Sequence, residues 1–321
     1  MLRRRIAFAG VMVAAVFATG YAAAVAIVWN KLTRVPDDCE RKWGSNTPES
    51  FAVPSPYVLD TRPWAMPAPE DVRLPSRDAG ITVAGWWLPA ASTDARAVIV
   101  VHGFTACRRD HAVLLPAGML HRNGFSILLI DLRDHGDSTI EDGRYAGGTD
   151  EYPDVLGAWD WLRAERGIRA DRIGLMGISL GAATVLLAAG REPRVAAVWE
   201  DSSYADFETV IRAELSREGF PSILAAGGVL AARIISGDNL GSYSPLDAVR
   251  RLKGRPLFIT HGDADTRLSM QYAHDLEAAV RNEEGSVETW LVPGAEHTEA
   301  MITHAVEYEL RLVDFFRRSL R

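Results

Sequence analysis

Residues 173–181 read IGLMGISLG, and this short stretch decides the fold that the sequence predicts. The apolar run Ile173–Met176 has the length of a buried strand, and the small residues Ala182–Ala189 continue as a helix. The pattern G-x-S-x-G between them is typical of a sharp turn that projects a serine beyond the end of a sheet. The pentapeptide can occur by chance, but the strand and helix around it favour a nucleophile at Ser179.

A serine hydroxyl is a weak nucleophile at neutral pH, so it needs a histidine to accept its proton and a carboxylate to orient that histidine. We expect His297 in this role, because it follows the apolar run Trp290–Val292 in a loop at a strand end. His304 is the alternative, but it falls inside the helix predicted to follow that loop.

Two aspartates are candidates for the carboxylate. Asp263 and Asp265 both follow the predicted strand Pro256–Ile259, and either could instead cap a turn there. Both choices satisfy the chain order serine, aspartate, histidine, so this order does not separate them.

Two backbone amides are predicted to stabilise the oxyanion of a tetrahedral intermediate. Leu180 follows the nucleophile and supplies the first amide. Phe104 supplies the second, because it follows the buried run Val98–Val101 and Gly103 allows the turn that aims its amide. We expect His102, at the start of this loop, to have a structural role.

Strand-length apolar runs alternate with longer helical patterns through the body of the chain. The predicted strands are 81–88, 97–101, 125–130, 172–176, 195–199, 256–259 and 287–292, and helices are predicted at 112–121 and 152–165. This alternation indicates an α/β fold whose mostly parallel central sheet has helices on both faces.

Two further motifs carry a family resemblance. Residues 131–138 (DLRDHGDS) are similar to a loop of the form D-x-R-G-H-G-x-S, with Asp134 in place of the commoner glycine, and residues 261–265 match H-G-x-x-D. With these motifs the chain resembles the α/β-hydrolase superfamily, specifically bacterial relatives of serine aminopeptidases, prolyl-oligopeptidase-like hydrolases and acyl-thioesterase-like enzymes. The resemblance covers residues 72–321, implies the α/β-hydrolase fold with a helical cap insertion, and favours Asp265 as the triad acid.

An uncharged apolar segment, Ile6–Trp29, is long enough to cross a hydrocarbon core of roughly 30 Å. Three arginines precede it and fewer basic residues follow, which favours a cytoplasmic N-terminus and an exported remainder. A cleavable signal peptide is the alternative, although its apolar core usually spans only about 7 to 15 residues. We therefore expect a single-pass membrane protein with an extracytoplasmic catalytic domain, or a secreted protein if the leader is cleaved.

The predicted domain organisation has three parts. Residues 1–30 are the membrane anchor or signal peptide, residues 31–71 a proline-rich linker, and residues 72–321 the catalytic domain. The linker resists regular helix because eight of the 16 prolines lie between Pro36 and Pro75. Its aromatic residues indicate that it packs across the domain rather than hanging free.

Residues 200–255 form an insertion at the place where related enzymes often carry a cap over the active site. Within it, Ile223–Ile235 is apolar but, at 13 residues, too short to span a bilayer. A core-packing helix is the simpler interpretation of this segment, and an acyl-pocket lining or a lipid-sensing lid is the alternative. We expect substrate specificity to lie in the insertion.

Composition excludes several classes of function. The chain has 48% hydrophobic and 24% charged residues and a net charge of −7, so nucleic acid is not an expected partner. Cys39 and Cys107 are too few for a zinc site; two free thiols are the simpler interpretation, and a disulfide is permissible in an exported domain. The scattered histidines lack metal-ligand spacing, so we expect neither a metal nor a cofactor.

The predicted function is hydrolysis of a carboxylic ester or thioester through an acyl-enzyme on Ser179, with a small-molecule or lipid-like ester as substrate. Ester hydrolysis is favoured over a second possibility, peptide or amide cleavage by the same residues. A non-catalytic, membrane-tethered protein that keeps the fold is a third. The sequence does not indicate the oligomeric state.

Overall fold

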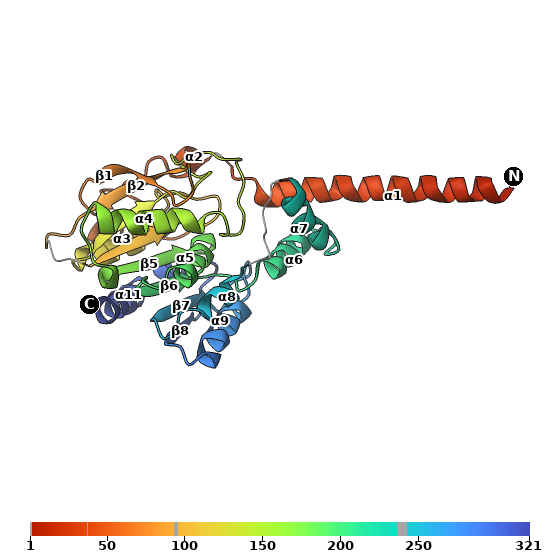
Figure 1. The fold of residues 1–321 in the computed structure, drawn as a ribbon. Helices are drawn as coiled ribbons and strands as arrows, with labels where there is room; N and C mark the ends of the chain where they lie inside the picture. Colours follow the sequence, from red (N-terminus) through yellow and green to blue (C-terminus); the bar gives the residue numbers. More distant parts are fainter. Residues whose placement is uncertain (1, 37, 93–95, 236–242) are drawn as a thin grey trace. The chain divides into compact units, whose positions relative to one another are not determined.

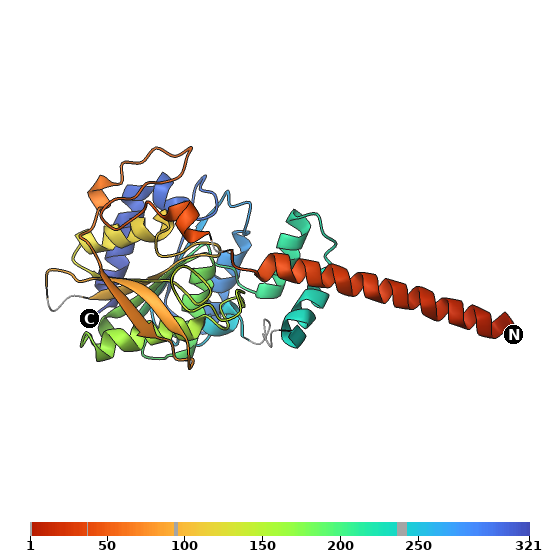
Figure 2. The same ribbon diagram turned by 90° about the horizontal axis from the view of Figure 1, so that it is seen from above.

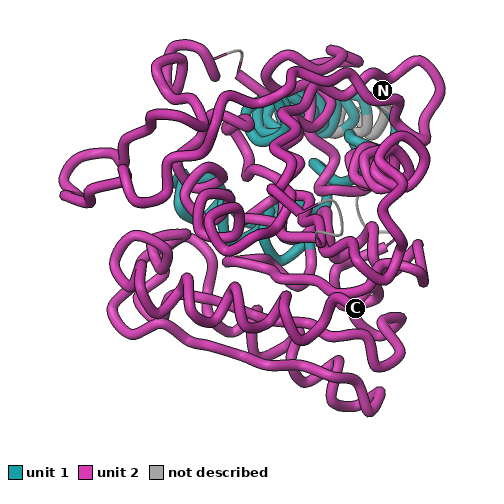
Figure 3. The backbone as a smooth tube through the Cα atoms, turned by 90° about the vertical axis from the view of Figure 1, so that its left-hand side faces the viewer, with its two compact units in different colours: residues 1–34, 207–242 teal, residues 35–206, 243–321 magenta. Residues whose placement is uncertain are grey.

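The computed structural model describes residues 2–36, 38–92, 96–235 and 243–321. The chain divides into two compact units, coloured separately in Figure 3. Unit 1 consists of Met1–Arg34 and Phe207–Ser242, and unit 2 consists of Val35–Asp206 and Tyr243–Arg321. The insertion between the two parts of unit 2 therefore belongs with the N-terminal segment.

Unit 2 is built on an eight-stranded sheet in the order β1-β2-β4-β3-β5-β6-β7-β8. The strands β3 to β8 pair in parallel, whereas β2 pairs antiparallel with both β1 and β4. The strand bounds are β1 Glu70–Pro75, β2 Thr82–Leu88, β3 Ala97–Val101, β4 Ser126–Ile130, β5 Ile173–Ile178, β6 Ala197–Asp201, β7 Leu257–Gly262 and β8 Val287–Val292. This sheet confirms the predicted α/β-hydrolase fold with its mostly parallel strands.

Helices cover both faces of the sheet (Figures 1 and 2). One face carries α3 His111–Arg122, α10 Ala300–Thr303 and α11 Ala305–Ser319; the other carries α4 Tyr152–Ala164, α5 Leu180–Arg191, α8 Pro245–Val249 and α9 Gln271–Asn282. Along β3, the side chain of Ile99 joins one hydrophobic core while Val98 and Val100 join the other. All five β3 residues are buried, which explains why this strand is a continuous apolar run.

The segment predicted to be a linker contributes to the core of unit 2. It contains the short helices α2 Cys39–Trp43 and η1 Arg62–Trp64. Phe51, Trp64 and Met66 are buried in the core on the α3 face. A Cβ on Gly118 of α3 would lie only 2.1 Å from the Trp64 carbonyl oxygen, so glycine allows this segment to lie directly on α3.

Cys39 and Cys107 form a disulfide bond that joins α2 to the loop after β3. The simpler interpretation from the sequence, two free thiols, is therefore wrong. The cysteines are separated by 68 positions in the sequence, and the packing of residues 35–66 against the rest of unit 2 brings them together.

Unit 1 contains three described helices: α1 Leu2–Thr33, α6 Phe207–Arg217 and α7 Leu224–Ile235. Figures 1 and 2 show α6 and α7 beside α1. Lys31 of α1 forms an ion pair with Glu218, directly after α6. Within α1, the stretch Ala14–Thr33 is long and apolar enough to cross a membrane, and its length and composition also suit a signal sequence.

Candidate active site

Ser179 lies between the end of β5 and the start of α5. Its backbone has φ 55° and ψ −114°, a strained conformation for a residue with a side chain. A Cβ on Gly177 would lie 2.1 Å from the Gly181 carbonyl oxygen, and one on Gly181 would lie 2.3 Å from the Val101 carbonyl oxygen. Both glycines are therefore required by the tight turn, as the G-x-S-x-G pattern predicts.

The structure brings Ser179, His297 and Asp265 together. His297 Nε2 lies 2.9 Å from Ser179 Oγ, and His297 Nδ1 lies 2.7 Å from Asp265 Oδ2. His297 is in the loop after β8, and Asp265 is in the loop after β7. Because both strands are parallel to β5, their ends deliver all three side chains to one edge of the sheet.

The carboxylate of Asp265 is fully buried and has hydrogen-bond donors at both oxygens. Its Oδ1 accepts hydrogen bonds from the backbone amides of Arg267 and Leu268, each at 2.8 Å. Burial alone would raise the pKa of Asp265, but hydrogen bonds from His261 and His297 hold it well below its usual range. The group is thus an ionised partner suited to orienting His297.

Asp263 and His304 take no part in the contacts among Ser179, His297 and Asp265. Asp263 Oδ1 accepts a hydrogen bond from the Gly294 amide at 2.7 Å, which fastens the loop after β7 to the loop after β8. His304 precedes α11, where its Nδ1 lies 3.0 Å from the Thr303 hydroxyl and its ring packs edge-on against Trp290. The geometry therefore favours Asp265 and His297 over these two alternatives.

A second contact fastens the two loops beside the site. Glu296 Oε2 accepts hydrogen bonds from the backbone amide and the hydroxyl of Thr266, both at 3.0 Å. Glu296 is the neighbour of His297, and Thr266 is the neighbour of Asp265. The contact between Glu296 and Thr266 therefore helps to keep His297 next to Asp265.

The loop with the predicted oxyanion donors lies next to the serine. A Cβ on Gly103 would lie 3.3 Å from Ser179 Cβ, so any side chain here would displace its neighbours by a few tenths of an ångström. Phe104 follows it, with its ring 5.0 Å from that of Tyr145. Leu180 begins α5, so its amide belongs to the first helical turn, where N–H groups have no partner within the helix.

His102 has the structural position expected for it. Its Nδ1 donates to the Gly103 carbonyl oxygen at 2.8 Å, and its Nε2 accepts from the Leu132 amide at 3.0 Å. Burial lowers the pKa of His102 to about 3, so the ring is neutral. It joins the loop after β3 to the loop after β4.

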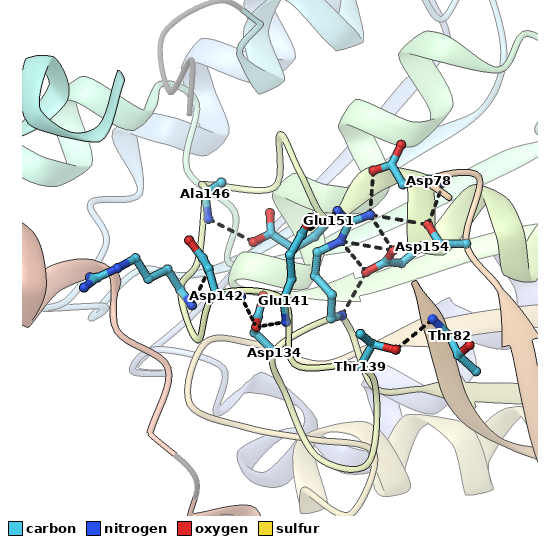
Figure 4. A network of polar contacts seen from close by, with 12 residues as sticks. Asp78, Thr82, Asp134, Thr139, Glu141, Asp142, Ala146, Glu151 and Asp154 are labelled. Carbon is cyan, nitrogen blue, oxygen red and sulfur yellow. Dashed lines mark hydrogen bonds and ion pairs between the residues drawn. The ribbon is translucent and has the colours of Figure 1, made fainter. Parts of the chain in front are cut away.

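The loop after β4 is held by a network of charged side chains (Figure 4). The guanidinium of Arg133 pairs with Asp154 at 2.8 Å, Asp78 at 2.7 Å and Glu141 at 3.0 Å. Asp134 has a positive φ of 63°, which explains why glycine is commoner at this position in the resembling loops. Its carboxylate compensates by accepting hydrogen bonds from the amides of residues 141, 142 and 143.

Sequence reasoning missed the residues behind Asp265. His261 Nε2 lies 3.2 Å from Asp265 Oδ2 and 2.8 Å from the Leu268 carbonyl oxygen. Nearby, burial raises the pKa of Glu200 to about 8, and the charge of His261 opposes this rise. The only sequence signal for His261 was its place in the H-G-x-x-D motif, which does not state a role.

Comparison with known proteins gives a family. A sequence model of the prolyl oligopeptidase family matches residues 117–321, more than half of the chain, which includes β5, β7 and β8. Among the residues that the structure describes, no group of three or more His, Cys, Asp or Glu side chains could hold a metal ion.

Individual relatives are more distant. An uncharacterized 31.7 kDa protein of Escherichia coli is 30% identical over 138 residues, covering 42% of this chain and 47% of that protein. The chain thus spans about half the length of this relative. The thiohydrolase aneE of Aspergillus aculeatus is 33% identical over 101 residues, 31% of each chain. A Pyrococcus furiosus esterase structure has a TM-score of 0.65 at 20% identity, covering 86% of this chain and 99% of the esterase, which shows a shared fold.

Proposed function

Because the chain belongs to the prolyl oligopeptidase family, we propose that it is a serine hydrolase that cleaves a carboxylic ester or thioester through an acyl-enzyme on Ser179. The observation that carries the proposal is the set of contacts that joins Ser179, His297 and Asp265 at the end of the sheet. His297 lies within hydrogen-bond distance of both Ser179 Oγ, at 2.9 Å, and Asp265 Oδ2, at 2.7 Å. This is the geometry that a nucleophile, its base and an orienting carboxylate require.

Each residue has a defined role in the proposed reaction. Ser179 Oγ attacks the substrate carbonyl while His297 Nε2 accepts its proton, and Asp265 stabilises the imidazolium that results. The amides of Leu180 and Phe104 donate to the oxyanion of the tetrahedral intermediate. His297 then protonates the leaving alcohol or thiol, and a water deprotonated by His297 hydrolyses the acyl-enzyme in the second half of the cycle.

Peptide or amide cleavage is the second candidate function. The family model favours it, because the family is named for an oligopeptidase. The likeness to the aneE thiohydrolase favours a thioester instead. The two activities share their nucleophile and base and differ in the leaving group, so parallel assays on p-nitrophenyl esters, acyl thioesters and peptide anilides distinguish them.

The proposal includes a membrane anchor and an extracytoplasmic unit 2. The apolar stretch Ala14–Thr33 supports the anchor, and the Cys39–Cys107 bond supports export, because disulfides persist in oxidising compartments. Mass determination of the chain purified from membranes tests the anchor. An intact N-terminus supports it, and a chain shortened within residues 20–30 identifies a cleaved signal peptide instead.

Labelling with a fluorophosphonate probe tests the catalytic proposal. We expect the full chain to be labelled, the Ser179→Ala variant to be unlabelled, and the His297→Ala variant to lose nearly all labelling. His304→Ala is the matched control, because this histidine contacts Thr303 rather than Ser179 or Asp265. This variant should be labelled like the wild type. Failure of the folded wild type to label would favour the non-catalytic alternative.

A further inference from the structure

The insertion helix α7 is fastened to α1 by close contacts. The hydroxyl of Tyr21 donates to the Ile223 carbonyl oxygen at 3.2 Å. At Gly227, a Cβ would lie 2.6 Å from both the Tyr21 hydroxyl and a Val25 methyl group, so any larger residue here would displace these side chains of α1. Small residues at such a crossing are typical of helices that pack inside membranes.

These contacts lie within the candidate membrane span rather than beyond it. Tyr21 and Val25 both belong to the stretch Ala14–Thr33. Lys31, which pairs with Glu218, marks the polar end of this stretch. At about 1.5 Å per residue, Tyr21 lies roughly 15 Å from Lys31 along the helix axis. If α1 crosses a bilayer, the part of α7 that contacts Tyr21 therefore lies at the depth of the hydrocarbon.

Beside its contact with α1, α7 has an exposed apolar side. Ile223, Leu230 and Ile234 are 71%, 57% and 72% exposed, and their spacing places them along one side of the helix. Leaving large apolar side chains in water is unfavourable, whereas hydrocarbon accepts them. On α1, Phe17 and Val16 are similarly exposed.

The neighbouring helix α6 has the opposite character. It carries the ion pairs Glu208–Arg212 and Glu214–Arg217. These charges suit water or the headgroup region, whereas α7 is apolar apart from Arg233 in its last turn.

From these observations we propose that α7 is inserted into the bilayer together with α1, with Ile223, Leu230 and Ile234 in contact with lipid acyl chains. With 12 residues α7 is too short to span the membrane, so it lies in one leaflet against the anchor. The inference rests on the proposed membrane anchor but not on the proposed hydrolysis. Its consequence is that the insertion contacts the acyl chains of lipids directly.

Site-directed fluorescence on the full chain in lipid vesicles tests the inference. Both native cysteines are in the disulfide, so in the absence of reductant a single introduced cysteine is the free thiol for an environment-sensitive fluorophore. Leu230→Cys and Ile234→Cys report on α7. Phe17→Cys reports on the anchor, and Ser216→Cys, exposed on α6, is the matched control in the same unit.

We expect labels at residues 230 and 234 to emit at shorter wavelength than in water and to lose most of their fluorescence in vesicles of acyl-brominated lipid, as the label at residue 17 does. The label at residue 216 should show neither change. If only the residue 17 label is quenched, insertion of α7 into the bilayer is overturned and the α1 anchor is supported. In that case, emission at shorter wavelength without quenching at residue 230 indicates a contact with protein, such as a second copy of the chain. If the residue 17 label is not quenched, the anchor fails, and the inference fails with it. Fluorophosphonate labelling of Ser179 in the same samples reports separately on the proposed hydrolase.

Discussion

The side chain of His261 lies 3.2 Å from the carboxylate of Asp265, at the same oxygen that contacts His297. His261 Nε2 is also 2.8 Å from the Leu268 carbonyl oxygen, which can only accept, so this nitrogen carries the hydrogen. The N–H of His261 therefore lies beside Asp265 Oδ2 as well as the Leu268 carbonyl oxygen. We infer that it is a positioning residue, which keeps Asp265 ionised and aimed at His297.

Replacement of His261 tests this role. His261→Leu removes this N–H, so the Asp265 carboxylate should stabilise the protonated form of His297 more strongly, and the acid side of the pH profile of kcat/KM should move to higher pH. We expect a loss of about tenfold in kcat/KM, the effect of one hydrogen bond to a charged group of about 1.5 kcal/mol. His261→Gln keeps an N–H donor and should lose less.

The matched control is His274→Gln on the exposed side of α9, which should leave the pH profile unchanged. A purely structural His261 would lower the yield or stability of both His261 variants while the pH profile of the remaining activity stays in place. That result would contradict the positioning role.

Substitution of the two aspartates separates the candidates that the sequence left open. Asp265→Asn should lower kcat by about 10³-fold or more, because the amide leaves His297 in the wrong tautomer. Asp263→Asn keeps an oxygen that can accept from the Gly294 amide, so it should retain activity within a fewfold of the wild type. Steady-state ester hydrolysis measures both variants, and equal losses would contradict the assignment of Asp265.

The ester chain-length profile tests the substrate class. If the insertion provides an apolar acyl site, medium-chain p-nitrophenyl esters should have a higher kcat/KM than the acetate, because each additional buried CH₂ contributes about 0.8 kcal/mol. The Ser179→Ala variant gives the background rate for each ester. A flat or inverted profile would contradict an apolar acyl site.

Much of the fold was predictable because the sheet is buried on both faces. The strands Ala97–Val101 and Val287–Val292 agree with their predictions residue for residue, since each is an apolar or alternating run with clear ends. The strand β1, Glu70–Pro75, was not predicted. Only Val72 and Leu74 of its six residues are buried, and the prolines around it obscured this short alternation.

At the site, residues that follow a local pattern were predicted, and contacts between distant segments were not. Ser179 and His297 follow strands at recognisable turns, so local pattern located them. The contact of His261 with Asp265, the Cys39–Cys107 bond and the exposed side of α7 depend on how distant segments fold together. No local pattern records such proximity, and single-sequence reasoning therefore left these features open.

Reduction of the disulfide should destabilise unit 2. The bond closes a loop across a sequence separation of 68, for which chain entropy predicts a stabilisation of about 4 kcal/mol. We expect thermal unfolding of the detergent-solubilised full chain to shift to lower temperature with reductant. The double variant Cys39→Ser with Cys107→Ser should match the reduced wild type and be insensitive to reductant. No shift of the wild type on reduction would contradict a stabilising role for the bond.

The buried carboxyl of Glu151 should make stability depend on pH. Burial raises the pKa of Glu151 to about 8 in the folded protein, whereas its usual value is near 4.5, so between these values folding keeps a proton that the unfolded chain releases. The free energy of unfolding should therefore decrease as pH rises from about 4.5 to 8, by at most about 5 kcal/mol from this group, and this group should cause no further change above pH 8.

Glu151→Gln removes this dependence while its amide oxygen can still accept from the Ala146 amide, the contact drawn in Figure 4. Relative to the wild type, the variant should become more stable as pH rises from 5 to 8, measured by thermal unfolding across that range. Glu165→Gln, at an exposed position just after α4, is the control and should run parallel to the wild type. Parallel curves for Glu151→Gln and the wild type would contradict this prediction, because they would mean that Glu151 is ionised in the folded protein. Interactions other than the hydrogen bond from the Ala146 amide would then have to stabilise the buried charge.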